Sequence, residues 1–280
     1  MIYLYNIHSR DIEFKFMSIQ IKYSKTFSSR NSVNKVLFVE NKLKIFNLKK
    51  YLSSKEYNFI SDLIKSKKDK EKILSFDFSS KVKITLLFFM RDVNSTDLEN
   101  LGAKFYDIFK SSEIKNFNIN ADTLPKSKIN IIGHFLHGIK LKSYKFEKYK
   151  TKKSNENFII EVNVNNNLSL KNLKKFKAIE DGTFYARDLV SEPGNILHPD
   201  EYAKRIKSLQ KDGLKINIYD EKKLKKLGMN TLLGVGQGSI RGSYLVTMEW
   251  KGLKDNSKPL AFVGKGVCFD TGGISLKPAK

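Results

Sequence analysis

The sequence predicts an α/β protein: a small N-terminal α/β domain over residues 1–165, followed over residues 166–280 by a second α/β domain with a mixed central sheet. Three observations support this prediction. The chain has 280 residues, enough for two cores. Strand-like apolar runs alternate with helical patterns along its first half, which is typical of α/β domains. An Asn-rich segment, residues 163–168, then precedes a long helical pattern and marks a candidate boundary.

The first domain is expected to begin with a strand directly after Met17, which makes residues 1–16 a candidate spurious start. Helices are expected where apolar residues recur at helical spacing, over 51–65 and from Ser95 to about residue 111. A charged, Lys-rich stretch over 142–156 suggests an exposed hairpin. The remaining apolar runs are predicted strands: 33–40 and 42–46, separated by a turn at Asn41, then 81–90, 128–135 and 157–164.

The second domain is expected to open with a long helix over 169–191, which Pro193 and Gly194 end. A second helix follows His198-Pro199-Asp200 and runs to about residue 210, since proline and an acidic residue both suit a first turn. Further predictions are a short helix over 221–226 and strands over 216–219, 244–250 and 260–263. Trp250 is expected in the core.

Composition excludes some classes of protein. The longest mostly apolar run, residues 84–90, is far too short to span a membrane, and no secretory signal is visible at residues 1–10. The single cysteine, Cys268, cannot form an internal disulfide, which favours the cytoplasm, and its neighbours do not suggest a nucleophile.

The net charge of +23 invites a nucleic-acid interpretation. The basic residues are nearly all lysines spread along the chain, however, whereas base and phosphate recognition often uses the bidentate arginine side chain. Abundant Asn, Ile, Phe and Tyr accompany the lysines, a bias that AT-rich coding produces. A selected nucleic-acid-binding surface therefore remains the weaker interpretation.

The most informative stretch is residues 263–278, Val-Gly-Lys-Gly-Val-Cys-Phe-Asp-Thr-Gly-Gly-Ile-Ser-Leu-Lys-Pro. A predicted strand runs into a glycine-rich loop that carries Lys265, Asp270 and Lys277. Ligands of open α/β sheets bind at such strand ends, and glycines let a ligand approach the backbone closely. A carboxylate can bridge two cations and a charged lysine can stabilise an oxyanion. The residues alone equally allow a phosphate cradle or a structural turn.

This stretch resembles, nearly residue for residue, the first active-site block of the cytosolic leucyl aminopeptidase family. The resemblance extends upstream through residues 186–193, 195–199, 227–229 and 233–239. It is specific from about residue 180 onward, while residues 1–165 share only the architecture of the family's smaller domain. Residues 166–280 would then be the first, incomplete part of the catalytic domain.

The resemblance implies a dimetal exopeptidase, a metal-dependent enzyme that releases leucine and other N-terminal residues from peptides. Lys265 would ligate one of two divalent ions, Mn or Zn, Asp270 would bridge both, and Lys277 would be the catalytic lysine that holds the peptide carbonyl. It also implies a homo-hexamer in the complete enzyme.

The family pattern continues beyond this block with further carboxylate ligands that the 280 residues do not contain. One lysine and one aspartate are too few ligands for a stable dinuclear site, so the polypeptide as written is expected to be inactive. The alternative is a catalytically dead remnant with a basic, nucleic-acid-binding surface.

Two other features carry a simpler interpretation. His134 and His137 are three residues apart, a spacing that suits a metal pair on a helix, but we expect structural histidines at the end of an apolar strand. Residues 234–238, Gly-Val-Gly-Gln-Gly, lack the spacing of a nucleotide fingerprint and are expected to form a loop near the active site.

Overall fold

The structure is a computed structural model that describes residues 19–24, 34–65, 71–79, 82–125, 131–152, 158–164, 170–253 and 258–268. It divides into two compact units, residues 1–186 and 187–280. The predicted domain boundary after residue 165 stays a prediction, since the long helix α4 (Leu170–Ser191) spans the division between the units. No helix among the described residues has the length and apolarity needed to cross a membrane.

The N-terminal unit is built on a six-stranded sheet with the strand order β1-β6-β5-β2-β4-β3. Neighbouring strands are parallel except for β3, which pairs antiparallel with β4 at one edge. The predicted α/β class is thereby confirmed. The strands are β1 (Ile19–Ser24), β2 (Asn34–Val39), β3 (Ile73–Asp77), β4 (Lys83–Phe88), β5 (Asn116–Asn120) and β6 (Phe158–Asn163).

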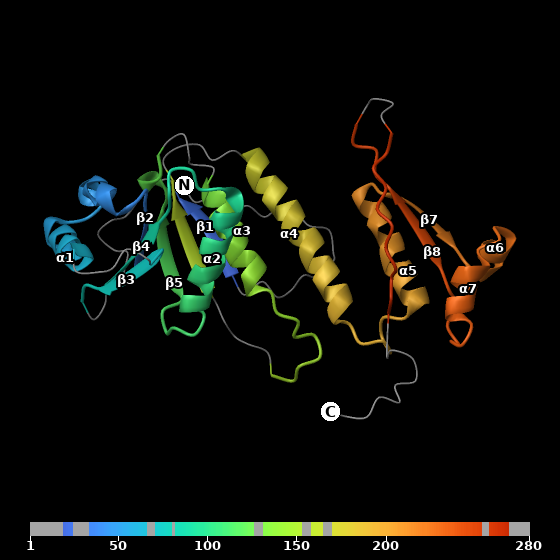
Figure 1. The fold of residues 1–280 in the computed structure, drawn as a ribbon. Coiled ribbons are helices and arrows are strands. Elements are labelled where there is room, and N and C mark those ends of the chain that lie inside the picture. The colour runs from blue at the N-terminus through green and yellow to red at the C-terminus, as the bar shows by residue number, and fades with distance from the viewer. Residues whose placement is uncertain are drawn as a thin grey trace. The chain divides into compact units, whose positions relative to one another are not determined.

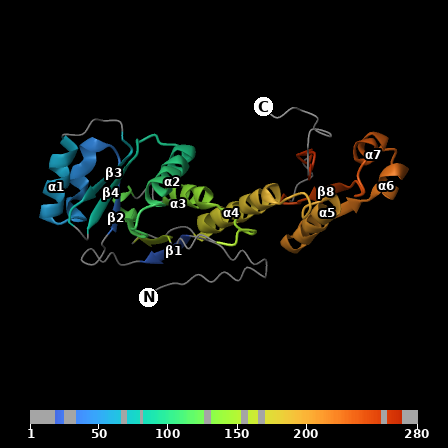
Figure 2. The same cartoon turned by 90° about the horizontal axis from the view of Figure 1, so that it is seen from below.

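Helices cover both faces of this sheet, with α1 (Ser54–Lys65) on one side and α2 (Ser95–Phe109) and α3 (Ile131–Ser143) on the other (Figures 1 and 2). Alternate residues of β2 point to opposite faces, so Leu37 joins the α1 core while Phe38 joins the α2 and α3 core. Aromatic rings fill the second core, where Phe105 packs against Phe135 with ring centroids 5.6 Å apart. Short turns of 3-10 helix occur at η1 (Lys42–Lys50) and η2 (Ala121–Thr123).

The C-terminal unit contains the end of α4, the helix α5 (Pro199–Ser208), the 3-10 turn η4 (Leu209–Asp212), and a two-stranded antiparallel sheet of β7 (Lys215–Tyr219) and β8 (Leu245–Glu249). Two short helices, α6 (Glu221–Lys226) and α7 (Asn230–Gly236), connect the strands. Its core is small, since the buried apolar residues of the described part are only Leu197, Ala203, Ile206, Ile216 and Leu224.

Several predictions for the N-terminal unit are wrong. Residues 42–46 are not a strand but part of η1, because the φ of 106° at Asn41 turns the chain out of its extended path. The predicted strand over 128–135 is the start of α3 from Ile131 onward, where buried residues recur at helical spacing; residues 126–130 lie outside the described residues. The described part of the hairpin expected over 142–156 contains no strand, since α3 extends to Ser143 and residues 144–152 are not extended; residues 153–156 lie outside the described residues.

In the C-terminal unit, residues 258–268 contain no strand, so the strand predicted over 260–263 is wrong. Phe262 and Val263 are 89% and 99% exposed, which removes the burial that an apolar strand requires. Trp250 is 67% exposed and does not belong to the core. The first part of the glycine run over 234–238 is helical, since α7 ends at Gly236.

Candidate functional site

The start of α5 is fixed by a small polar cluster. His198 is the N-terminal cap of the helix, and its Nδ1 hydrogen-bonds the carboxylate of Asp200. Arg241 contacts the other oxygen of that carboxylate, with Nη1 3.2 Å from Oδ2. Desolvation opposes ionisation, but a backbone N–H and the hydrogen bond and charge of His198, together with Arg241, hold the pKa of Asp200 below its ordinary value.

A second ion-pair network ties α5 to the segment that follows α4. Nε of Arg205 lies 3.0 Å from Oε1 of Glu201 on the same helix. Nη1 of Arg205 lies 3.0 Å from Oε1 of Glu192, whose side chain is only 2% exposed. Burial would lower the pKa of Arg205, but the two carboxylates raise it, so the guanidinium stays charged. This pairing fixes the turn between α4 and α5, in the region of the motifs over 186–199.

The segment that carries Lys265 passes over α5. The Val267 N–H donates to the carbonyl oxygen of Lys265 at 3.1 Å, which makes a tight turn, and the Lys265 side chain is exposed. A Cβ on Gly266 would lie 2.9 Å from the ring of Tyr202, so a glycine is needed for this close approach. The expectation that the glycines of this loop admit a ligand stays a prediction.

Cys268 ends the described part of this segment. Burial, and then the negative charge of Asp200, raise the pKa of its thiol above the ordinary value. The expectation that Cys268 does not act as a nucleophile stays a prediction.

The predicted constellation is only partly visible. Lys265 is described, whereas Asp270 and Lys277 lie outside the described residues, so their roles stay predictions. Amine nitrogen and carboxylate oxygen are chemically suitable ligands for divalent ions. Within the described ranges, however, no group of three or more His, Cys, Asp or Glu residues could hold a metal. The described part of the chain therefore does not by itself form the implied dimetal site.

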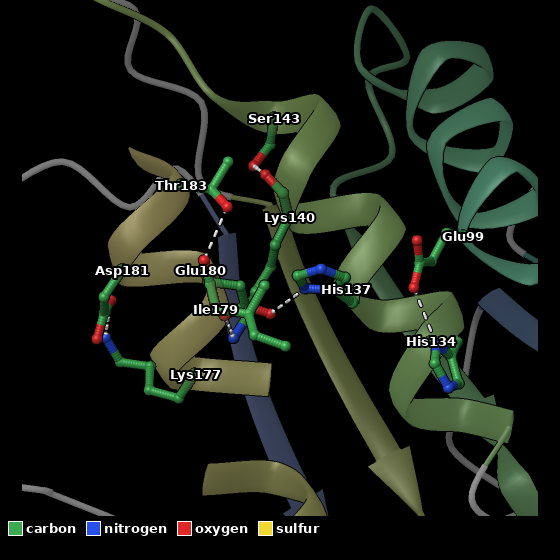
Figure 3. A network of polar contacts seen from close by, with 10 residues as sticks. All are labelled: Glu99, His134, His137, Lys140, Ser143, Lys177, Ile179, Glu180, Asp181 and Thr183. Carbon is green, nitrogen blue, oxygen red and sulfur yellow. Dashed lines mark hydrogen bonds and ion pairs between the residues drawn. The ribbon is translucent and has the colours of Figure 1, made fainter. Parts of the chain in front are cut away.

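His134 and His137 lie on α3 rather than at the end of a strand, and they face different carboxylates (Figure 3). His134 Nδ1 is 2.8 Å from Glu99 on α2, and His137 Nδ1 is 3.1 Å from Glu180 on α4. Each ring faces its own carboxylate on a different helix, so both histidines contribute to the packing of α3 against its neighbours.

Sequence reasoning missed these polar pairs. The spacing of Glu201 and Arg205, four residues apart on a predicted helix, could have indicated an ion pair. No local signal could have indicated that Arg241 contacts Asp200 or that Glu180 contacts His137, since both contacts join residues some 40 positions apart in the chain.

Part of the chain is similar to known proteins. Residues 184–280 match the model of the cytosol aminopeptidase family, catalytic domain. The chain is 50% identical over 149 residues to a probable cytosol aminopeptidase of Brucella suis, a match that covers 51% of this chain and 30% of the relative. A probable cytosol aminopeptidase of Caulobacter vibrioides is 49% identical over 148 residues, with 51% of this chain and 30% of the relative covered. The matches thus span about 30% of the length of these curated relatives.

Solved structures share the fold. A mutant of tomato leucine aminopeptidase superposes with a TM-score of 0.69 at 21% identity, covering 91% of this chain and 55% of that one. The bottromycin maturation enzyme BotP in complex with Mn gives a TM-score of 0.57 at 15% identity, covering 79% of this chain and 45% of that one. At these identities the likeness concerns the fold alone.

Proposed function

We propose that this chain is part of a metal-dependent aminopeptidase that releases N-terminal residues, leucine among them, from peptides, because residues 184–280 match the model of the catalytic domain of the cytosol aminopeptidase family. The observation that carries the proposal is the 50% identity over 149 residues to a probable cytosol aminopeptidase. We place the complete enzyme in the cytoplasm and propose a homo-hexamer.

The proposed roles follow the terminal motif. Lys265 and Asp270 would bind divalent metal, Mn or Zn, and Lys277 would be the catalytic lysine. The charged ammonium of a lysine can polarise the carbonyl of a peptide bond and stabilise the negative charge that develops on its oxygen. The two ligands are fewer than a stable dinuclear site needs, so we propose that the 280-residue polypeptide alone has no peptidase activity.

A chimera tests this proposal. Residues 184–280 would replace the corresponding segment of the Brucella suis relative, and hydrolysis of leucine p-nitroanilide would be measured with and without manganese. We expect the chimera to be active and the 280-residue polypeptide to be inactive. Lys265→Gln or Lys277→Gln should abolish activity in the chimera, whereas Lys258→Gln, at an exposed lysine outside the motif, should preserve it. Turnover by the 280-residue polypeptide, or equal activity of the Lys277→Gln and Lys258→Gln chimeras, would contradict the proposal.

The remnant hypothesis rests on the net charge of +23 alone. It gains support only if the 280-residue polypeptide binds DNA with a steep salt dependence while the chimera is inactive.

A further inference from the structure

The N-terminal unit contains a pocket that the proposed peptidase motif does not use. It lies where α2, α3 and α4 meet and has a volume of about 310 Å³, at the small end of natural ligand sites. Its polar lining comes from Ser95, His134 and Lys175, and its apolar lining includes Leu98, Ile131 and Phe176. A pocket of this size and lining suits a small ligand with one polar and one apolar end.

The wall of the pocket that α4 provides is held firmly against α3. The ring of Phe176 lies edge-on to His134 with centroids 4.9 Å apart, and a Cβ on Gly133 would come within 2.4 Å of that ring. Glu180, one turn further along α4, accepts hydrogen bonds from His137 and Lys140 on α3 (Figure 3). The apolar wall is therefore fixed in place before any ligand binds, which reduces the entropic cost of binding.

The polar side of the pocket is suited to a negative charge. Lys175 is exposed, and none of the described carboxylates forms an ion pair with its ammonium group. Ser95 is the first residue of α2, where the helix dipole also favours an anion. Because Nδ1 of His134 is 2.8 Å from Glu99, Nε2 is the ring nitrogen that can contact a ligand.

We propose that this pocket binds a small carboxylate with an apolar side chain. The carboxylate contacts Lys175 and the Ser95 hydroxyl, and the side chain packs against Leu98, Ile131 and Phe176. Free branched-chain acids and the carboxyl terminus of a peptide both have this chemistry. The site lies wholly within the N-terminal unit, so the proposal is independent of the peptidase assignment.

Three probes of matched chemistry test the proposal on the full 280-residue chain by saturation-transfer NMR and calorimetry. 4-Methylpentanoate carries both the charge and the apolar group, 4-methylpentanamide has the same shape without the charge, and acetate has the charge without the apolar group. We expect 4-methylpentanoate to bind at least about threefold more tightly than either partial probe. A dipeptide ending in leucine, with its free-acid and amide forms compared, separates the peptide source from the free acid.

Two lysine variants then locate the site. Lys175→Gln should weaken 4-methylpentanoate binding about threefold to tenfold, whereas Lys174→Gln, at the neighbouring exposed lysine, should leave it unchanged. Equal binding of acid and amide, equal binding of acetate, equal effects of the two substitutions, or no binding up to the solubility limit would each overturn the proposal. The comparison of acid with amide needs no variant, so it tests whether the carboxylate contributes to binding even if a substitution perturbs folding.

Discussion

Glu180 on α4 accepts a hydrogen bond from Nδ1 of His137 on α3 at 3.1 Å, although only 2% of the Glu180 side chain is exposed. Lys140 donates to the other carboxylate oxygen at 2.8 Å, so the buried charge is fully paired. Burial, and then the charge of Glu180, raise the pKa of nearby Tyr23 on β1. The carboxylate thus joins α4 to α3 close to the sheet.

Removing this carboxylate should destabilise the N-terminal unit. Glu180→Ala leaves Lys140 partly buried without its counter-ion and His137 buried without an acceptor, so we expect a loss of about 3 to 5 kcal/mol in the free energy of unfolding. Asp181→Ala is the matched control, because Asp181 pairs with Lys177 where both side chains are 39% exposed, so its loss should cost less than about 1 kcal/mol. Urea unfolding followed by far-UV circular dichroism measures both, and equal losses would contradict the structure.

The closest approach of α2 and α3 depends on two glycines. A Cβ on Gly138 would lie 1.9 Å from the carbonyl oxygen of Glu99, and a Cβ on Gly102 would lie 2.0 Å from that of Phe135. Because both neighbours are backbone atoms, Gly138→Ala must push the helices apart, and we expect a cost of about 3 kcal/mol. Gly182→Ala on α4, where nothing lies within 4 Å, should instead stabilise by about 0.5 to 1 kcal/mol. Thermal unfolding of the two variants should shift in opposite directions.

The elements that could be predicted from the sequence are those with local signals. The helix that begins at Ser95 has a capping Asn94 whose side chain accepts from the Asp97 N–H, and α5 begins with Pro199 after His198. Residues 131–135 carry an apolar run that suits a strand or a buried helix equally, and burial on several sides of α3 decides for the helix. The strand β5 (Asn116–Asn120) was missed because three of its five residues are Asn, which is depleted in strands.

In the candidate site, too, some features have a local sequence signal and others depend on contacts between distant parts of the chain. Lys265, Asp270 and Lys277 lie within one short motif, so a resemblance could indicate them without any tertiary information. The Arg241 contact with Asp200 joins distant parts of the chain, and only the fold reveals it. The pocket beside Phe176 is of the same kind, since its lining comes from residues spread between Val93 and Phe176.

Acid should weaken the N-terminal unit through Glu56. Lys35 lies 2.7 Å from one oxygen of Glu56, and the Ser53 backbone N–H donates to the other at 2.9 Å, with the Glu56 side chain only 8% exposed. Burial works to raise the pKa of Glu56, but these hydrogen bonds from Lys35 and Ser53 prevail and lower it below 4.5. In the unfolded chain the carboxyl has its ordinary, higher pKa. At pH values between the folded and the unfolded pKa the unfolded state therefore binds more protons, and the free energy of unfolding rises with pH.

The contribution of Glu56 is therefore complete above its ordinary pKa of 4.5 and is lost as the pH falls through the lower value of the folded state. We expect Glu56→Gln to reduce the urea midpoint near neutral pH and to flatten its fall between about pH 5 and about pH 3. Glu113→Gln, at an exposed position, should retain the original slope. An unchanged slope in Glu56→Gln would show that other carboxylates control the acid sensitivity.

The reactivity of Cys268 should depend on Asp200. Burial and the charge of Asp200 both raise the pKa of the thiol, and only the thiolate reacts with iodoacetamide. Asp200→Asn removes the charge at nearly constant volume, so more thiolate is present at neutral pH and alkylation should be faster; each unit of pKa corresponds to about tenfold. Asp212→Asn removes one negative charge at an exposed position of the same unit and should leave the rate unchanged. Mass spectrometry of timed reactions measures both rates, and the same rate in the two variants would mean that burial alone, and not Asp200, keeps the thiol protonated.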